Sequence, residues 1–372
     1  MNKTTKLVYL RFVLISCLFL TACNPSINLD QLKNLGSQKP EDTISQGNIN
    51  SEDILKADRL VALVYQNKLY LADPDYPKPY PIYEFKHQEQ PVRQKLDTFE
   101  ISPDKQWVVW YTPGKGVLAL DTSTKKVQVV NQPSDFLNTN PYFEFDQGNN
   151  LYFITNNGNT LVKTNLTSGE RSSVAIPYPY GNVFKVSPDQ QHILFISGYG
   201  QTEGEPQFMF TDNSGNFLVQ FTTKTNLADR HQVIWTPDSR GVAMINGQNL
   251  EYYSVNDPNS AQVLFSVGEG DRILNINRVG NDIYLFTSQG YWHVYDYAQG
   301  KEVARTPIAI AKELNSPVFY PWKEKQLLIE ETLPEGEAQF NRLWVSDLKG
   351  NKKMVMDKYH EVIVKTQLQD LD

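Results

Sequence analysis

The sequence predicts an all-β protein in which one strand-turn-strand unit recurs seven times, which is the pattern of a seven-bladed β-propeller. The first observation is a short alternating segment ending in Asp or Asn that returns about every 40–50 residues, a period typical of propeller blades. The second is the content of strand-favouring aromatics, with 20 Tyr and 18 Phe. The third is the length of 372 residues, which all-β repeat folds often fill with one domain.

The N-terminus has the features of a leader that is removed. In residues 1–22, three basic residues precede or border an apolar run over Phe12–Leu20. This run is shorter than the roughly 20 residues that a membrane-spanning helix needs. The leader ends at Leu20–Cys23, LTAC, which resembles the lipobox of bacterial lipoproteins. The resemblance implies that Cys23 receives a diacylglyceryl group and that cleavage exposes an α-amine open to acylation, for example with palmitate.

Two acyl chains are enough for stable membrane anchoring, so the resemblance predicts a lipid-anchored protein of the bacterial cell envelope. Asn24 follows the lipidated residue, whereas an Asp there would resemble the inner-membrane retention signal of enteric bacteria. Asn24 therefore favours the outer membrane in a host that has one. Residues 23–57 are rich in Asn, Ser, Gln and Asp, and we interpret them as a flexible tether that reaches roughly 30 Å.

The cysteine content and the net charge limit the classes of function that the protein can have. The only cysteines are Cys17 in the leader and Cys23, so the mature chain is expected to have no disulfide and no thiolate nucleophile. Removing the leader takes away three basic groups and no acidic ones, which changes the net charge from −7 to −10. This acidic balance argues against nucleic acid as a partner and against direct adsorption to anionic lipid. We therefore expect the lipid on Cys23 to attach the protein to the membrane.

From Asp58 to the end, residues 58–372, the third strand of each repeat gives the clearest register. These strands end at Asp73, Asp121, Asn165, Asp212, Asn256, Asp296 and Asp347. Each is followed by a turn, where Asp and Asn side chains accept hydrogen bonds from backbone N–H groups two residues on.

A second register comes from the turns SPD at Ser102–Asp104, SPD at Ser187–Asp189 and TPD at Thr236–Asp238. These turns resemble the WSPDGxxIAFxS…IYVMD repeat of TolB-like, WD-type propellers, and the resemblance covers about 58–367. The Gly that usually follows the Asp is replaced here by Lys105, Gln190 and Ser239. The resemblance implies a role in envelope assembly without naming a partner.

The first repeat contains only three predicted strands, Leu60–Tyr65, Lys68–Asp73 and Pro81–Phe85, and lacks the innermost one. At the other end, Glu361–Gln367 is a spare strand without a hairpin partner. We predict that this C-terminal strand completes the first blade and closes the ring, which would remove an exposed edge. The alternative is an extended tail.

No enzyme signature is present. The chain has no G-x-S-x-G motif, and it ends with the seventh blade, so no catalytic residue and no cofactor are assigned. The five histidines, none with metal-ligand spacing to another, are His87, His192, His231, His293 and His360. Those at 192 and 293 lie within predicted strands, which favours a structural role, and no metal is assigned. A metal held in the channel by histidines of different blades, as in the metal-dependent propeller oligogalacturonate lyase, is the alternative, with His231 nearest the channel mouth.

Loop lengths predict which face of the propeller contacts a partner. The long loops Gly198–Gln207 and Leu333–Arg342 share one face with crossings that contain Pro177–Tyr180 and Phe319–Trp322. The residues predicted to contact a partner there are Tyr178, Tyr180, Tyr199, Glu203, Trp322 and Phe340. The alternative is that these aromatics stiffen the crossings and pack on blade edges. The sequence therefore predicts non-catalytic binding of an envelope protein or a polymer such as glycan. A carbohydrate-active lyase or hydrolase working at the channel mouth is the alternative function.

Overall fold

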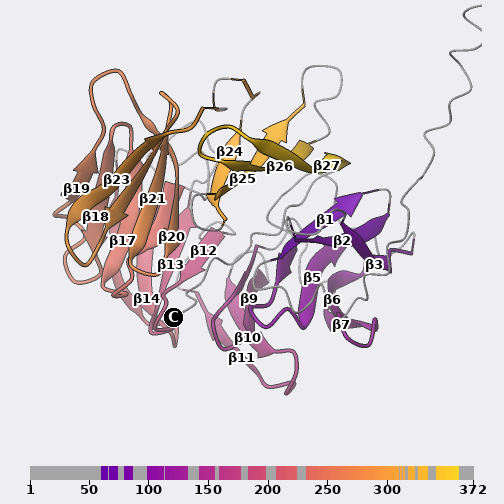
Figure 1. Cartoon of the computed structure of the whole chain (residues 1–372). Coiled ribbons are helices and arrows are strands. Elements are labelled where there is room, and N and C mark those ends of the chain that lie inside the picture. The colour runs from indigo at the N-terminus through magenta and orange to yellow at the C-terminus, as the bar shows by residue number, and fades with distance from the viewer. Residues whose placement is uncertain are drawn as a thin grey trace, which may run out of the picture. The chain divides into compact units, whose positions relative to one another are not determined.

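The computed structural model (Figure 1) describes residues 60–65, 67–73, 79–86, 99–112, 114–132, 142–155, 159–176, 183–197, 207–223, 232–309, 311, 313–314, 317–322, 326–333 and 341–359. The leader, the lipidation site Cys23, the tether and the predicted closing strand Glu361–Gln367 lie outside these residues. In the described part of the chain, no helix is long and apolar enough to cross a membrane.

The described residues form strands throughout. Blade 1 consists of β1 (Val61–Tyr65), β2 (Lys68–Ala72) and β3 (Tyr80–Glu84), and blade 2 consists of β4 (Phe99–Ile101), β5 (Trp107–Thr112), β6 (Gly116–Asp121) and β7 (Val127–Asn131). Blade 3 consists of β8 (Phe143–Phe145), β9 (Asn150–Thr155), β10 (Thr160–Asn165) and β11 (Arg171–Ala175). Blade 4 consists of β12 (Val183–Val186), β13 (His192–Ser197), β14 (Gln207–Asp212) and β15 (Phe217–Thr222). Blade 5 consists of β16 (Val233–Trp235), β17 (Gly241–Asn246), β18 (Asn249–Ser254) and β19 (Gln262–Ser266). Blade 6 consists of β20 (Ile273–Val279), β21 (Asp282–Thr287), β22 (Tyr291–Asp296) and β23 (Lys301–Pro307). Blade 7 consists of β24 (Val318–Pro321), β25 (Gln326–Thr332), β26 (Asn341–Asp347) and β27 (Lys352–Tyr359).

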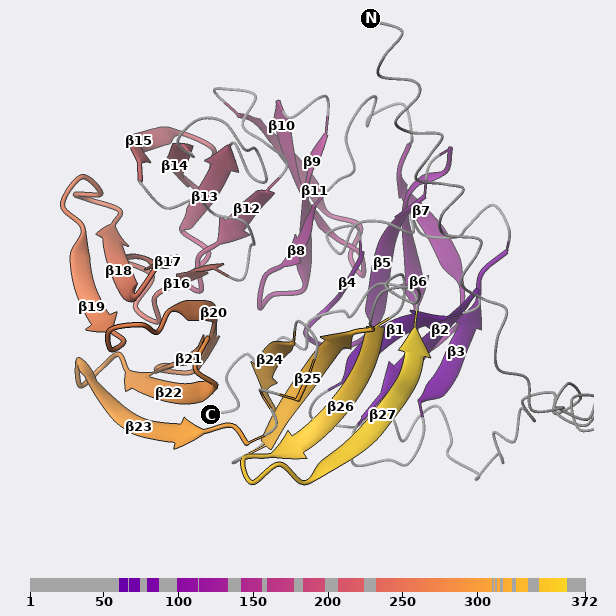
Figure 2. The same cartoon turned by 90° about the horizontal axis from the view of Figure 1, so that it is seen from above.

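The strands form seven antiparallel sheets, each made of strands consecutive in the chain. Figure 2 shows these sheets following one another as the blades of a propeller. Six sheets have four strands, and the first, β1-β2-β3, has three within the described residues. The predicted all-β, seven-bladed architecture is therefore confirmed, and so are the three strands predicted for the first blade. Whether the C-terminal strand completes that blade stays a prediction.

Buried apolar side chains hold the blades together in pairs. In the described part of the chain, seven hydrophobic clusters each combine residues of two adjacent blades. One of them joins the last blade to the first, because Val61 and Leu63 of β1 pack with Trp322 and Leu343 of blade 7. The ring of blades is thus closed by side-chain packing among the described residues.

Hydrogen bonds also cross between innermost strands. Val186 donates its N–H to Glu144 Oε1 at 3.1 Å, which links blade 4 to blade 3. The side chain of Asn275 donates to the carbonyl oxygen of Phe319 at 2.8 Å, which links blade 6 to blade 7. Glu144 is half-buried and Phe319 is buried, so leaving either acceptor oxygen without a hydrogen bond would lower the stability of the fold. These bonds fix the spacing of neighbouring blades near the centre.

The Ser-Pro-Asp turns explain the residues that replace the expected glycine. Ser187 donates its hydroxyl to Asp189 Oδ1 at 2.6 Å, and the same oxygen accepts the N–H of Gln191 at 3.0 Å. The residues after the Asp in the three turns, Lys105, Gln190 and Ser239, have φ values of 63°, 60° and 58°. This left-handed conformation is easiest for glycine, so the turn retains the geometry of the repeat although its usual residue is absent.

Candidate functional site

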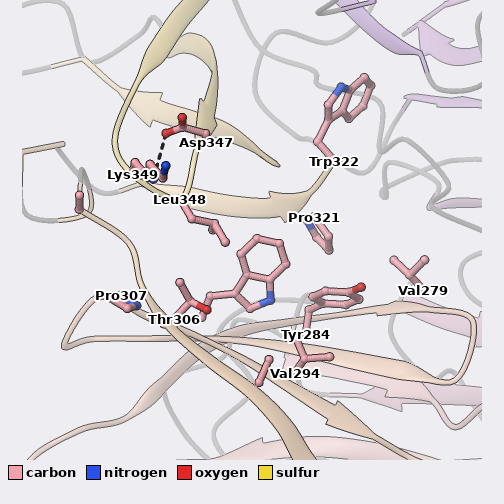
Figure 3. Close-up of a pocket in the computed structure, with 13 residues that line it drawn as sticks. Val279, Tyr284, Val294, Thr306, Pro307, Pro321, Trp322, Asp347, Leu348 and Lys349 are labelled. Carbon is pink, nitrogen blue, oxygen red and sulfur yellow. Dashed lines mark hydrogen bonds between the residues drawn. The ribbon is translucent and has the colours of Figure 1, made fainter. Parts of the chain in front are cut away.

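A pocket of about 1210 Å³ lies between blades 6 and 7 (Figure 3). Blade 6 supplies an apolar wall from successive strands, with Val279, Tyr284, Trp292, Val294, Ala304 and Thr306 among its residues. Pro307, the last residue of β23, and Ala309 beyond it extend this wall. Blade 7 supplies Pro321, Trp322 and the turn Asp347–Lys349. The pocket is therefore bounded by one sheet face and by the end of the next sheet.

The strand register explains why blade 6 leaves this space. Val294 lies opposite Tyr284 on β21 and opposite Ala304 on β23, and Trp292 lies opposite Thr306. Directly opposed residues share a face of an antiparallel sheet, so these side chains all project toward the pocket side. The outermost strand contributes Ala304, Thr306 and, at its end, Pro307. The small side chains of Ala304 and Thr306 leave Tyr284 and Val294 partly uncovered.

Aromatic packing fixes the floor of the pocket. The ring of Trp292 lies 5.3 Å from that of Tyr284 and 5.9 Å from that of Phe286, measured between centroids. The indole is largely buried, and its N–H has no acceptor among the described residues. An amide-like donor buried without a partner is unfavourable. The floor is thus a rigid apolar surface that contains one unsatisfied donor.

The opposite wall is a turn fixed by a carboxylate. Asp347 Oδ1 accepts the N–H groups of Lys349 and Asn351, each at 2.9 Å, and Oδ2 accepts the Asn351 side-chain amide at 2.8 Å. The side-chain bond from Asn351, followed by the backbone bonds, holds the pKa of Asp347 below its ordinary value. Figure 3 shows Leu348 extending from this turn toward the blade 6 residues. The turn therefore presents an apolar side chain to the pocket and leaves Lys349 exposed at its rim.

Charged side chains of both signs lie at and near the turn that bounds the pocket, and the lining itself contains one of each, Asp347 and Lys349. Lys349 is exposed at the rim. Lys352 follows the turn, with its Nζ 4.9 Å from the centre of the Trp344 ring and 4.0 Å from Glu313. The pocket is therefore suited to an apolar group.

The chemistry of the lining favours binding. Its titratable residues are Tyr284, Asp347 and Lys349, and the carboxylate of Asp347 already accepts the hydrogen bonds of its own turn. Within the described residues, no group of three or more His, Cys, Asp or Glu side chains is placed to hold a metal ion. The arrangement can enclose an apolar ligand, with Lys349 exposed at the rim.

The residues predicted from the sequence fall mostly elsewhere. Cys23, Tyr178, Tyr180, Tyr199, Glu203 and Phe340 lie outside the described residues, so their roles stay predictions. Trp322 is described and fully buried, and it packs against Val61 and Leu63 of blade 1. It borders the pocket, but Figure 3 shows its indole directed away from the other lining side chains. Trp322 is therefore not an exposed anchor, and it behaves as an aromatic packed on a blade edge.

The two described histidines lie within strands and pack against aromatic rings. His293 is buried, with its Nδ1 2.7 Å from Glu302 Oε1 and its ring 5.3 Å from that of Phe265. His192 stacks on Trp235 with ring centroids 6.3 Å apart. This packing agrees with the structural role that their positions within strands predict. His87, His231 and His360 lie outside the described residues.

Comparisons with known proteins identify the fold. No family model matches the chain, and no curated protein matches it. Among solved structures it is similar to an oligogalacturonate lyase in complex with manganese, with a TM-score of 0.51 and 13% identity over 80% of this chain and 84% of that one. It is also similar to apo AztD from Citrobacter koseri, with a TM-score of 0.47 and 10% identity over 84% of this chain and 99% of that one. The likeness to the lyase supports the propeller fold.

Proposed function

We propose that the protein is a lipid-anchored lipoprotein of the bacterial envelope that binds a protein or polymer partner without catalysis, with the pocket between blades 6 and 7 as a contact site. The pocket is the observation that carries this proposal. Its volume of about 1210 Å³ exceeds the roughly 300–1,000 Å³ of common ligand sites. Its walls are mainly apolar, with a few polar groups at the rim, which is the usual composition of a binding site.

The proposed location in the bacterial envelope rests on the leader and on the repeat. The run Leu20–Cys23 supports lipid attachment at Cys23, and Asn24 supports the outer membrane in a host that has one. The left-handed residues after the Ser-Pro-Asp turns support the resemblance to TolB-like propellers, which favours a role in envelope assembly. The face around Tyr178, Tyr180, Tyr199, Glu203 and Phe340 remains the proposed second contact surface for the same partner.

A dye-binding experiment tests whether the pocket accepts an apolar ligand. Anilinonaphthalene sulfonate, an apolar anion, is expected to bind the mature protein with enhanced fluorescence. Ala304→Trp places a large side chain in the pocket and is expected to remove most of this signal. Val129→Trp, at an exposed position of the outer strand of blade 2, is the matched control and is expected to keep it. Equal dye binding by the wild type and Ala304→Trp would refute the proposal for this pocket.

A carbohydrate-active enzyme is the second candidate, and one observation favours it. Glu100 and Glu144 lie at the centres of β4 and β8, the innermost strands of neighbouring blades. Two carboxylates are the usual catalytic pair of glycoside hydrolysis. Here, however, Glu100 Oε1 accepts the N–H of Ile101 at 3.2 Å, and Glu144 Oε1 accepts that of Val186. Product release from uronic-acid polymers that disappears in Glu100→Gln and Glu144→Gln would favour the enzyme over the binding protein.

A further inference from the structure

The hairpin tip of blade 5 places an asparagine directly before a glycine. β17 ends at Asn246 and β18 begins at Asn249, and these two residues are paired. Gly247 and Gln248 form the turn between them, and both are exposed. Gly247 has a φ of 62°, and a positive φ at the first residue of such a short turn suits glycine. The fold therefore requires glycine at this position.

An Asn-Gly pair is chemically reactive, because no side chain on the glycine obstructs attack by its backbone nitrogen on the asparagine amide. The N–H of Gly247 lies outside the ladder, since the hairpin closes with the pair Asn246–Asn249. A Cβ built on Gly247 would have no atom of the described residues within 4 Å. The chain's other Asn-Gly pair, 157–158, lies outside the described residues. The attacking nitrogen at 247 is thus uncrowded.

The reaction needs only water. The backbone nitrogen of Gly247 loses its proton and bonds to Cγ of Asn246, the Cγ–Nδ2 bond breaks, and the side-chain nitrogen leaves as ammonia. The product is a five-membered succinimide. Water from the solvent then cleaves one of its two C–N bonds. Cleavage at Cγ leaves aspartate, and cleavage at the original main-chain carbonyl leaves isoaspartate, whose main chain runs through Cγ.

The contacts of Asn246 show what this change does to the hairpin. Its Nδ2 donates to Glu251 Oε1 at 2.9 Å, and Glu251 Oε2 accepts the hydroxyl of Tyr253 at 2.7 Å. Glu251 is buried, and Asn246 is half-buried. A carboxylate at position 246 cannot donate this bond and would place a second negative charge beside Glu251, and like charges with little solvent between them repel.

The turn also connects blade 5 to blade 6. The carbonyl oxygen of Gly247 accepts the N–H of Ile273 at 3.0 Å, and that of Gln248 accepts the N–H of Val267 at 2.9 Å. Ile273 is the first residue of β20, the innermost strand of blade 6. Isoaspartate adds one carbon to the main chain immediately before Gly247. Both acceptor carbonyls would therefore shift away from their donors.

From these contacts we infer that Asn246 is a site of spontaneous covalent modification, where deamidation yields aspartate and isoaspartate and loosens both the hairpin of blade 5 and its connection to blade 6. The change accumulates with the age of the molecule. Neither the reaction nor its effect on the fold depends on the proposed partner-binding role.

The test follows the mature protein, kept folded at mildly alkaline pH, by peptide mass mapping over time. We expect residue 246 to gain the mass of an amide-to-acid exchange. Its isoaspartate is expected to accept a methyl group from S-adenosylmethionine when an isoaspartyl methyltransferase is added as the probe. Asn249 lies on the same hairpin but precedes Leu250, whose side chain obstructs the attack, and it is expected to remain unchanged. Fragment spectra distinguish the two positions.

Two variants measure the consequence for stability. Asn246→Asp is expected to lower the urea midpoint by roughly 0.5 M, because it removes the bond to Glu251 and opposes two acids. Asn249→Asp is the matched control: Asn249 Oδ1 accepts the hydroxyl of Ser266 at 2.7 Å, and a carboxylate oxygen accepts it as well, so the midpoint is expected to stay.

Three results would overturn the inference. The first is an Asn246 that stays intact in the folded protein although the urea-unfolded chain converts there. The second is equal conversion at positions 246 and 249, which would remove the role of Gly247. The third is an equal urea midpoint for Asn246→Asp and Asn249→Asp, which would show that the modification does not loosen the hairpin.

Discussion

The packing of blade 1 against blade 7 makes a quantitative prediction for Leu63→Ala. Leu63 lies on β1, is 0% exposed, and belongs to the cluster that also contains Trp322 and Leu343 of blade 7. Truncating a fully buried leucine removes its transfer free energy and leaves a cavity, which together cost about 2–5 kcal/mol. We therefore expect the free energy of unfolding to fall by an amount in this range.

The assay is urea unfolding of the mature protein, with Leu194→Ala as the matched reference. Leu194 is also 0% exposed and lies in the cluster between blades 4 and 5, which are consecutive in the chain. If the ring is closed by packing, the two substitutions lower the unfolding free energy by similar amounts. A loss below about 1 kcal/mol for Leu63→Ala, beside the full loss for Leu194→Ala, would show that the contact between the first and last blades is open in solution.

Three other predictions concern the anchor, the C-terminus and pH. Cys23→Ser should abolish both labelling by a fatty-acid analogue and membrane fractionation, and unchanged fractionation would exclude lipid attachment there. Truncation after Tyr359 should lower the unfolding free energy by about 3 kcal/mol or more if Val362 and Val364 are buried in blade 1, whereas an unchanged melting temperature would make the tail peripheral. Burial and the facing charge of Asp296 raise the pKa of Asp282, so the fold favours its protonated form and loses that stability as pH rises past about 4. Asp282→Asn should therefore raise the urea midpoint at pH 7 but not at pH 3, and an increase of equal size at both would refute this explanation.

Local patterns were enough to predict the blades. The Asp residues that end the third strands predicted turns, and Asp121 and Asp212 accept the N–H groups of Ser123 and Ser214, each at 2.9 Å. Alternation and turn chemistry act over a few residues, so the sequence displays them directly. For the same reason the three strands of blade 1 were predicted to within a residue of their observed bounds.

The site could not be predicted in the same way. The pocket depends on Ala304 and Thr306 being small and on Leu348 facing them from another blade. That pairing follows from the way two sheets meet, which no local pattern encodes. Trp322 was predicted to contact a partner because it belongs to the crossing Phe319–Trp322, but its side chain is buried in a cluster with Val61 and Leu63 from the other end of the chain. The small outer-strand residues Thr306 and Ala304, opposite Trp292 and Val294, were the available signal, and loop lengths carry no information about them.

Crosslinking in living cells tests the central claim most directly. A photoreactive amino acid at position 304 would lie in the pocket, and the same amino acid at position 129 would lie on the exposed outer strand of blade 2. We predict a specific adduct of defined mass from position 304 that is absent from position 129. No adduct from position 304, or the same adduct from both positions, would contradict the assignment of this pocket as a partner-binding site.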